Sequence, residues 1–171
     1  MNKKYEYKDR NKKLSLVAER DQLNRIVKQY PYSENSYAIT INNIDLDRKG
    51  LIDFSNYLNR NYLSFIFVQE MPQGIIKQNR FLNDYQYYKS KPNLNHWMQD
   101  EFSYHYHMVI NSKKEPTKRL KKIFPGSDID CKKVYSNNGG GYLLKQLDNI
   151  VKTNKNIEGI FYYDFKIPSI N

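Results

Sequence analysis

The sequence predicts an α+β fold in which helices pack on one sheet. Stretches of alternating apolar and polar residues, such as YAITINN at 37–43, are typical of strands with two distinct faces. Stretches with helical spacing of apolar residues separate these strands. The chain has 171 residues, which suits one compact domain over 1–171. Strands separated by helices in so short a chain favour a sheet covered by helices.

The expected order is helix, strand, helix, strand, insertion, strand, helix, strand, helix, strand. Besides a basic N-terminal helix at 14–29, the predicted helices are 53–63, 117–124, with Thr117 as its cap, and about 142–152. The predicted strands are 37–43, 64–70, 102–110, 129–135 and 159–167. Polar residues 1–13 are expected to fray, and residues 75–101 are interpreted as an inserted loop or short helix.

The charge balance points to a polyanionic partner. A net charge of +10 and a pI near 9.5 favour nucleic acid, although a basic solvated surface without a partner gives the same composition. The 117–124 helix carries a basic run that is a candidate contact for the DNA backbone, and the alternative for such a run is a solvated face. This run comprises Lys118, Arg119, Lys121 and Lys122.

Cysteine content and hydropathy indicate a cytoplasmic protein. Cys131 is the single cysteine, which excludes an intrachain disulfide and a cysteine-based zinc site and fits a reducing compartment. No apolar run reaches the roughly 18 residues that a membrane span needs. The basic N-terminal residues contain no apolar signal region, so neither secretion nor membrane insertion is expected.

A pair of histidines forms the first candidate site. His105 and His107 stand at i and i+2 in an apolar strand, so both imidazoles project from one face and can bind one divalent cation. Glu70, at the end of the 64–70 strand, is the candidate third ligand if the two strands are neighbours. The alternatives are a pair of half-buried aromatic side chains and a solvated strand-end glutamate. His96 is interpreted as a structural or surface residue.

A tyrosine at the start of the 142–152 helix is the candidate nucleophile. Tyr142 directly follows three glycines and lies on the polar face of the helix, opposite an apolar stripe, with Lys145 one turn further on. A phenol is a poor nucleophile at neutral pH, and a metal-bound phosphate with a nearby ammonium lowers that barrier. The alternative is one exposed tyrosine in a chain that has 16 of them.

Taken together, these motifs resemble the HUH endonuclease superfamily, specifically rolling-circle replication initiator (Rep) proteins of plasmids and single-stranded DNA viruses. The motifs that carry the resemblance are, in order, AITIN (38–42), a glutamate in VQEMPQG (68–74), HYH (105–107) and YLLK (142–145). The resemblance implies a ferredoxin-like or RRM-like antiparallel sheet with the histidines on a central strand. It also implies Mg²⁺ or Mn²⁺, cleavage of single-stranded DNA at an origin hairpin, and a 5′-phosphotyrosine with a free 3′-hydroxyl.

The resemblance also sets expectations about partners. Helicase motifs are absent, so unwinding and synthesis are expected to need a host helicase and polymerase, in a bacterial, archaeal or virus-infected cell. Position 146 is Gln, where a second tyrosine would follow Tyr142 after one turn, so a second strand transfer needs another tyrosine or another protomer, as in a homodimer. The tyrosine follows the histidines, which favours an initiator over a relaxase.

Three alternatives remain. A single-tyrosine HUH transposase also places the tyrosine after the histidines, but Lys145 favours the initiator. A non-catalytic, RRM-like nucleic-acid-binding module explains the charge and the aromatic residues through base stacking, but it explains neither HYH nor the glycine-tyrosine turn. A decayed initiator that keeps only the fold is the third.

Overall fold

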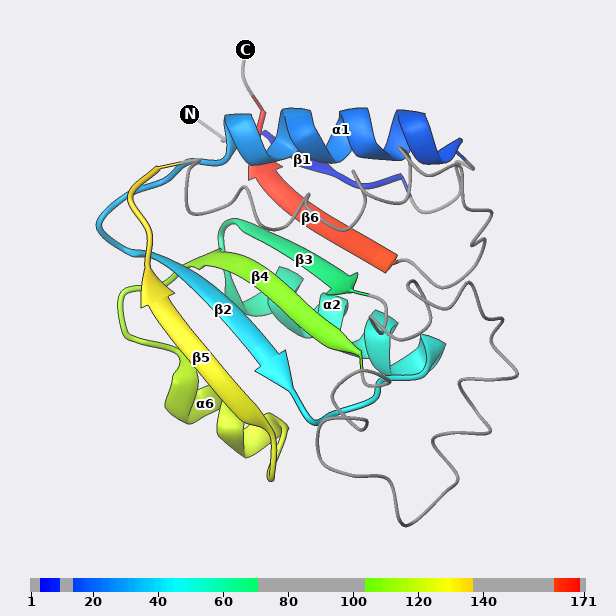
Figure 1. Ribbon diagram of the computed structural model, residues 1–171. Helices are drawn as coiled ribbons and strands as arrows, with labels where there is room; N and C mark the ends of the chain where they lie inside the picture. The colour runs from blue at the N-terminus through cyan, green and yellow to red at the C-terminus, as the bar shows by residue number, and fades with distance from the viewer. Residues whose placement is uncertain (1–3, 10–13, 71–103, 137–161, 170–171) are drawn as a thin grey trace.

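The computed structural model describes residues 4–9, 14–70, 104–136 and 162–169 (Figure 1). These residues form an α+β fold with a six-stranded antiparallel sheet. The elements are β1 (Tyr5–Tyr7), α1 (Leu16–Gln29), β2 (Ser36–Asn42), α2 (Arg48–Asn61), β3 (Phe65–Glu70), β4 (His105–Asn111), α6 (Thr117–Ile123), β5 (Asp128–Lys133) and β6 (Tyr162–Pro168). The predicted fold class, an antiparallel sheet with helices packed on it, is therefore confirmed.

The strand order places β4 in the interior of the sheet. From edge to edge the order is β1-β6-β3-β4-β2-β5. Within it, the unit β2-α2-β3-β4-α6-β5 has the order β5-β2-β4-β3, which is the ferredoxin-like arrangement. Strands β6 and β1 extend the sheet beyond β3. As a result β4, which carries both candidate histidines, has β3 on one side and β2 on the other.

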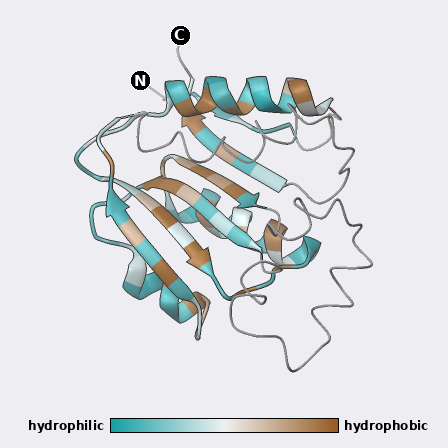
Figure 2. Cartoon of the chain, in the orientation of Figure 1, coloured by the Kyte–Doolittle hydropathy of each residue, from teal (hydrophilic) through white to brown (hydrophobic). Residues whose placement is uncertain are grey.

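Helices cover the two faces of the sheet unequally. On one side, called the α2 face below, Phe54 and Leu58 of α2 and Leu120 of α6 pack against buried strand residues. Figure 1 shows α2 passing behind β3 and β4. On the other side, called the α1 face, Leu23 and Ile26 of α1 pack against a second apolar cluster. In Figure 2 apolar and polar residues alternate along α1, as expected of a helix with one buried side.

Side-chain caps explain where the helices begin and end. Ser15 accepts a hydrogen bond from the Ala18 amide at the start of α1. Asp47 accepts one from the Gly50 amide at 2.7 Å, which starts α2 at Arg48 rather than at the predicted residue 53. At the other end of α2, the Lys166 ammonium donates to the Asn59 and Tyr62 carbonyls at 2.8 and 2.9 Å. Burial lowers the pKa of Lys166 from its usual value.

Two further expectations were wrong. Residues 1–13 were expected to fray, but Tyr5–Tyr7 form β1, which pairs with β6 in the register Tyr5↔Pro168. Thr117 does not cap α6: the cap position is Pro116, and the Glu115 carboxylate accepts the Thr117 amide at 3.1 Å. The predicted helix 142–152 and insertion 75–101 lie outside the described residues, as do residues 102–103 and 159–161 of two predicted strands.

Candidate metal centre

Strand pairing brings the three predicted ligands together. Antiparallel pairing of β3 and β4 places Glu70 directly opposite His105, and Val68 opposite His107. Both histidines project to the α1 face, because Val109, two residues further along β4, belongs to the apolar cluster there. One ligand atom from each of Glu70, His105 and His107 can be chosen so that all three lie within 4.8 Å of one another. The triad lies where β3 ends and β4 begins (Figure 1).

The triad is held by hydrogen bonds on both sides of His107. The His107 Nε2 lies 2.8 Å from the Glu70 Oε2, and its Nδ1 lies 3.0 Å from the Thr40 Oγ1. The His107 and Glu70 side chains are only 13% and 16% exposed. A hydroxyl can donate or accept, so Thr40 suits either tautomer of the imidazole. It donates to Nδ1 when Nε2 carries the proton, and it accepts from Nδ1 when Nε2 is free to bind a cation.

The donor set fits a divalent cation. Metal–ligand distances near 2.1 Å allow donors around one ion to lie up to roughly 4.2 Å apart, so small side-chain shifts from 4.8 Å complete the site. Two imidazole nitrogens and one carboxylate oxygen suit first-row divalent metals and leave coordination positions for a substrate oxygen. Binding requires His107 to give up its Nε2 contact with Glu70, which turns that hydrogen-bonded pair into two ligands.

Tyr106 anchors the strand segment between the two histidines. It points to the α2 face, where it is fully buried and stacks on Phe67 with ring planes 15° apart. Its hydroxyl accepts the Leu46 amide at 2.8 Å, and burial raises its pKa to about 12. The predicted alternation, with the histidines on one face and Tyr106 and Met108 on the other, is confirmed. This packing fixes the orientation of the histidine-bearing backbone.

Sequence reasoning gave no role to two β2 residues that border the triad. Thr40 lies directly opposite His107, and continuing that register by one pair places Asn42 opposite His105. The Asn42 Oδ1 is buried and has no hydrogen-bond partner among the residues described. The available signal was the polar character of Thr40 and Asn42 in a strand whose other face, Tyr37, Ile39 and Ile41, is apolar.

The predicted DNA-contacting residues lie on the other face of the sheet. Because α6 packs through Leu120 on the α2 face, its basic side chains are not brought next to the triad. Arg119 donates to the Asn61 side chain at 2.6 Å and lies over the Tyr57 ring, whereas Lys118, Lys121 and Lys122 are exposed. The predicted nucleophile Tyr142, its neighbour Lys145 and also His96 lie outside the described residues.

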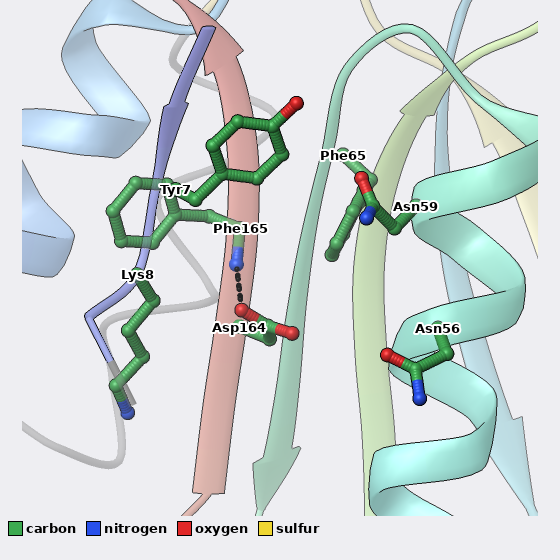
Figure 3. A pocket seen from close by; sticks show the side chains of 7 residues that line it. All are labelled: Tyr7, Lys8, Asn56, Asn59, Phe65, Asp164 and Phe165. Atoms are coloured by element: carbon green, nitrogen blue, oxygen red, sulfur yellow. Dashed lines mark hydrogen bonds between the residues drawn. The ribbon is translucent and has the colours of Figure 1, made fainter. Parts of the chain in front are cut away.

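A separate pocket of about 200 Å³ opens between β1, β6 and α2 (Figure 3). The Tyr7 ring and Lys8 come from the β1 side, and Asn56 and Asn59 face them from α2. The Asp164 carboxylate lies between the two groups and accepts the Phe165 amide at 2.9 Å. None of the three triad residues lines this pocket, so it is distinct from the candidate metal centre.

Comparison with models of protein families, with curated proteins and with solved structures found no match to this chain. Across the described segments, no helix is long and apolar enough to cross a membrane. A functional assignment therefore depends on the site itself: its residues, their geometry and the motifs that accompany them in the sequence.

Proposed function

We propose that this chain is an HUH-type, metal-dependent and site-specific endonuclease and strand transferase for single-stranded DNA, which initiates rolling-circle replication. The observation that carries the proposal is the Glu70–His105–His107 triad, assembled from two adjacent strands in the interior of an antiparallel sheet. The sequence adds the Tyr142-Leu-Leu-Lys145 motif, which directly follows three glycines. A half-buried histidine pair of no function does not account for a carboxylate at hydrogen-bonding distance within the same cluster.

In this proposal Glu70, His105 and His107 hold Mg²⁺ or Mn²⁺. When bound, the ion polarises the scissile phosphate and so supplies Lewis-acid chemistry. The Tyr142 oxygen attacks phosphorus, forming a bond between the tyrosine and the 5′-phosphate, while the bond from phosphorus to the 3′-oxygen breaks. The phenol proton is lost and the leaving oxygen gains one, giving a free 3′-hydroxyl. Lys145 neutralises charge on the phenolate and on the phosphorane-like transition state.

The proposed substrate is a single-stranded origin region, presented as or beside a hairpin. The net charge of +10 supports a polyanionic substrate. The proposal includes a host helicase to unwind the duplex and a host polymerase to extend the 3′-hydroxyl. A second protomer, in a homodimer, provides the further tyrosine that a second strand transfer requires.

The test is a denaturing gel after incubation with labelled origin-hairpin DNA and Mn²⁺. Wild-type protein is expected to give a slowly migrating covalent adduct, which chelation of the metal abolishes. Tyr142→Phe and His107→Ala are expected to give none. Tyr135→Phe is the matched control, because Tyr135 is 68% exposed and has no proposed role, and it should react like wild type.

Any one of three results would contradict the proposal or a part of it. An adduct that persists in Tyr142→Phe would assign the nucleophile to another tyrosine. Tight DNA binding that is independent of metal, with no adduct from any candidate origin, would instead favour the non-catalytic binding module. An adduct with transposon-end DNA but not with origin hairpins would favour the transposase.

A further inference from the structure

Asn42 occupies the end of β2 nearest to the triad. The β2–β4 register pairs Thr40 with His107 and Ile41 with Tyr106, and its next step places Asn42 opposite His105. On the other side of β4, Glu70 lies opposite the same histidine. Asn42, His105 and Glu70 therefore form one row across three neighbouring strands. Directly opposed residues of an antiparallel pair have Cβ atoms about 5 Å apart, which is within the reach of an asparagine side chain.

The side chain of Asn42 faces the same side of the sheet as the triad. Alternation along β2 assigns Ala38, Thr40 and Asn42 to one face. Ala38 packs against the apolar cluster of the α1 face, and Thr40 contacts the His107 ring. Ile39 and Ile41 pack on the opposite face. The Asn42 side chain consequently lies on the face of the sheet that carries the triad.

The side-chain carbonyl oxygen of Asn42 is a hydrogen-bond acceptor that lacks a donor among the described residues. It is buried, and no described residue donates a hydrogen bond to it. A buried acceptor without a donor is costly, and such groups in native proteins call for a specific explanation. Thr40, two residues earlier on the same face of β2, differs, because the Thr40 hydroxyl is engaged by His107. A cation bound by the triad is the partner that this oxygen lacks, since amide oxygens are common ligands of hard divalent ions.

We propose that the Asn42 Oδ1 is a further ligand of the divalent ion held by Glu70, His105 and His107. This inference rests on the metal centre of the proposed function. The resulting set has two nitrogens and two oxygens, of which only the Glu70 carboxylate carries a charge. A neutral fourth ligand strengthens binding without reducing the positive charge of the ion further, so the ion keeps its attraction for a phosphate oxygen. Six-coordinate Mn²⁺ or Mg²⁺ then retains two positions for substrate.

If Asn42 is a metal ligand, its two substitutions should affect Mn²⁺ affinity and DNA cleavage differently. A purely structural asparagine would not produce that difference. Asn42→Ala removes the oxygen and is expected to weaken Mn²⁺ binding by about tenfold or more. Asn42→Asp keeps the oxygen and adds a charge, so it should bind Mn²⁺ at least as tightly as wild type. The added negative charge should also make the bound ion less electrophilic and slow DNA cleavage. Rescue of binding without full rescue of cleavage is the expected signature.

The experiment is a direct Mn²⁺ titration of the full chain by calorimetry and by electron paramagnetic resonance. It compares wild type with Asn42→Ala, Asn42→Asp and His107→Ala, and uses Asn35→Ala as the control because Asn35 is exposed beyond the opposite end of β2. Thermal melts of the metal-free proteins accompany it. Removing an unsatisfied buried oxygen should leave the melting temperature of Asn42→Ala unchanged or raised, whereas loss of a structural hydrogen bond would lower it.

The outcomes distinguish the two proposals. Mn²⁺ binding by wild type that His107→Ala abolishes and Asn42→Ala leaves unchanged would overturn the role of Asn42 while sparing the metal centre. Weakened binding in both Asn42 variants would also overturn it, because the carboxylate should substitute for the amide. If Asn42→Ala does not fold, Asn42→Asp alone decides by its affinity. Absence of Mn²⁺ binding by wild type would overturn the metal centre, and the inference with it.

Discussion

Replacing Thr40 by valine tests whether β2 orients His107, a proposed metal ligand. Valine keeps the β-branched shape that suits the strand, so the change removes the hydroxyl with little alteration of packing. The Thr40 Oγ1 is 3.0 Å from the His107 Nδ1, and the Glu70 Oε2 is 2.8 Å from the Nε2 of the same ring. When a metal replaces the proton on Nε2, Thr40 remains as the hydrogen-bond partner that fixes the ring.

The expected effect follows from the size of that single interaction. A hydrogen bond contributes about 0.5–1.5 kcal/mol net, and a tenfold change in affinity corresponds to about 1.4 kcal/mol. Loss of the Thr40 contact should therefore weaken metal binding by about 2- to 12-fold. Partners of metal-ligating histidines typically contribute about 10- to 100-fold. The two ranges overlap near tenfold, which is the predicted loss for Thr40→Val.

Calorimetric titration with Mn²⁺ at fixed pH measures this loss. Thr117→Val is the matched control, because Thr117 lies on α6 at the α2 face and its hydroxyl bonds to Glu115. The control should bind Mn²⁺ like wild type. Equal affinity in Thr40→Val and wild type would refute the argument that Thr40 holds the Nδ1 of His107 in the metal-bound state. A loss of equal size in both threonine variants would point to general destabilisation instead.

Two further predictions concern DNA binding and alkaline stability. Changing Lys118, Lys121 and Lys122 together to alanine should reduce the salt dependence of single-stranded DNA binding. The slope of log affinity against log salt, measured by fluorescence anisotropy, should become shallower by about 2. An unchanged slope would exclude α6 from the interface. Burial raises the pKa of Tyr106 to about 12 and that of Tyr163 still further, so the folded chain keeps protons that the unfolded chain releases above pH 10. Stability should therefore fall from pH 10 upward, by about 2 kcal/mol for Tyr106 alone at pH 12, and tyrosinate absorbance should rise together with loss of circular dichroism. Ionisation well before unfolding would contradict that linkage.

Local patterns were sufficient for most of the fold. The alternation of Tyr37, Ile39 and Ile41 predicted β2 within a residue at each end, and the apolar run before Glu70 predicted β3. The start of α2 was predicted too late. In the sequence Gly50 disfavours a helix, whereas in the structure Asp47 caps the helix by accepting the Gly50 amide. A Cβ at position 50 would lie 3.2 Å from the Asp47 Oδ1, so the capped turn itself favours glycine there.

The edge strand β1 has no local signal that could have predicted it. Three residues are too few to show a period, and β1 exists because Tyr5 pairs with Pro168 at the other end of the chain. The side chains add to this pairing: Glu6 forms an ion pair with Arg25 of α1, and Lys8 lies over the Tyr163 ring at 3.5 Å from its centroid. Such long-range contacts cannot be read from the polar composition of residues 1–13.

The residues of the candidate site likewise differ in whether local sequence patterns can predict their role. The i, i+2 spacing of His105 and His107 predicts a shared face from local geometry alone. The inclusion of Glu70 depended on β3 and β4 being neighbours, a condition that the sequence left open and that the structure meets. Thr40 and Asn42 could not be placed, because their relevance depends on β2 pairing with the other side of β4. That adjacency arises from the order of the strands and not from any residue pattern.

The same strand order limits how DNA could reach both the triad and the basic helix. The crossovers through α2 and α6 place both helices on one face and leave the Glu70–His105–His107 triad on the other. A strand that contacts α6 and also reaches His107 must therefore pass around an edge of the sheet. The nearer edge is β5, which lies beside β2. Its exposed Asp130 and Asp128 lie opposite Thr40 and Asn42, in the rows of the triad, and its exposed Lys132 and Lys133 lie further from the triad. If the α6 lysines contribute to the salt slope, changing Lys132 and Lys133 to alanine tests whether the strand crosses the β5 edge beside them, and an unchanged slope would exclude that path.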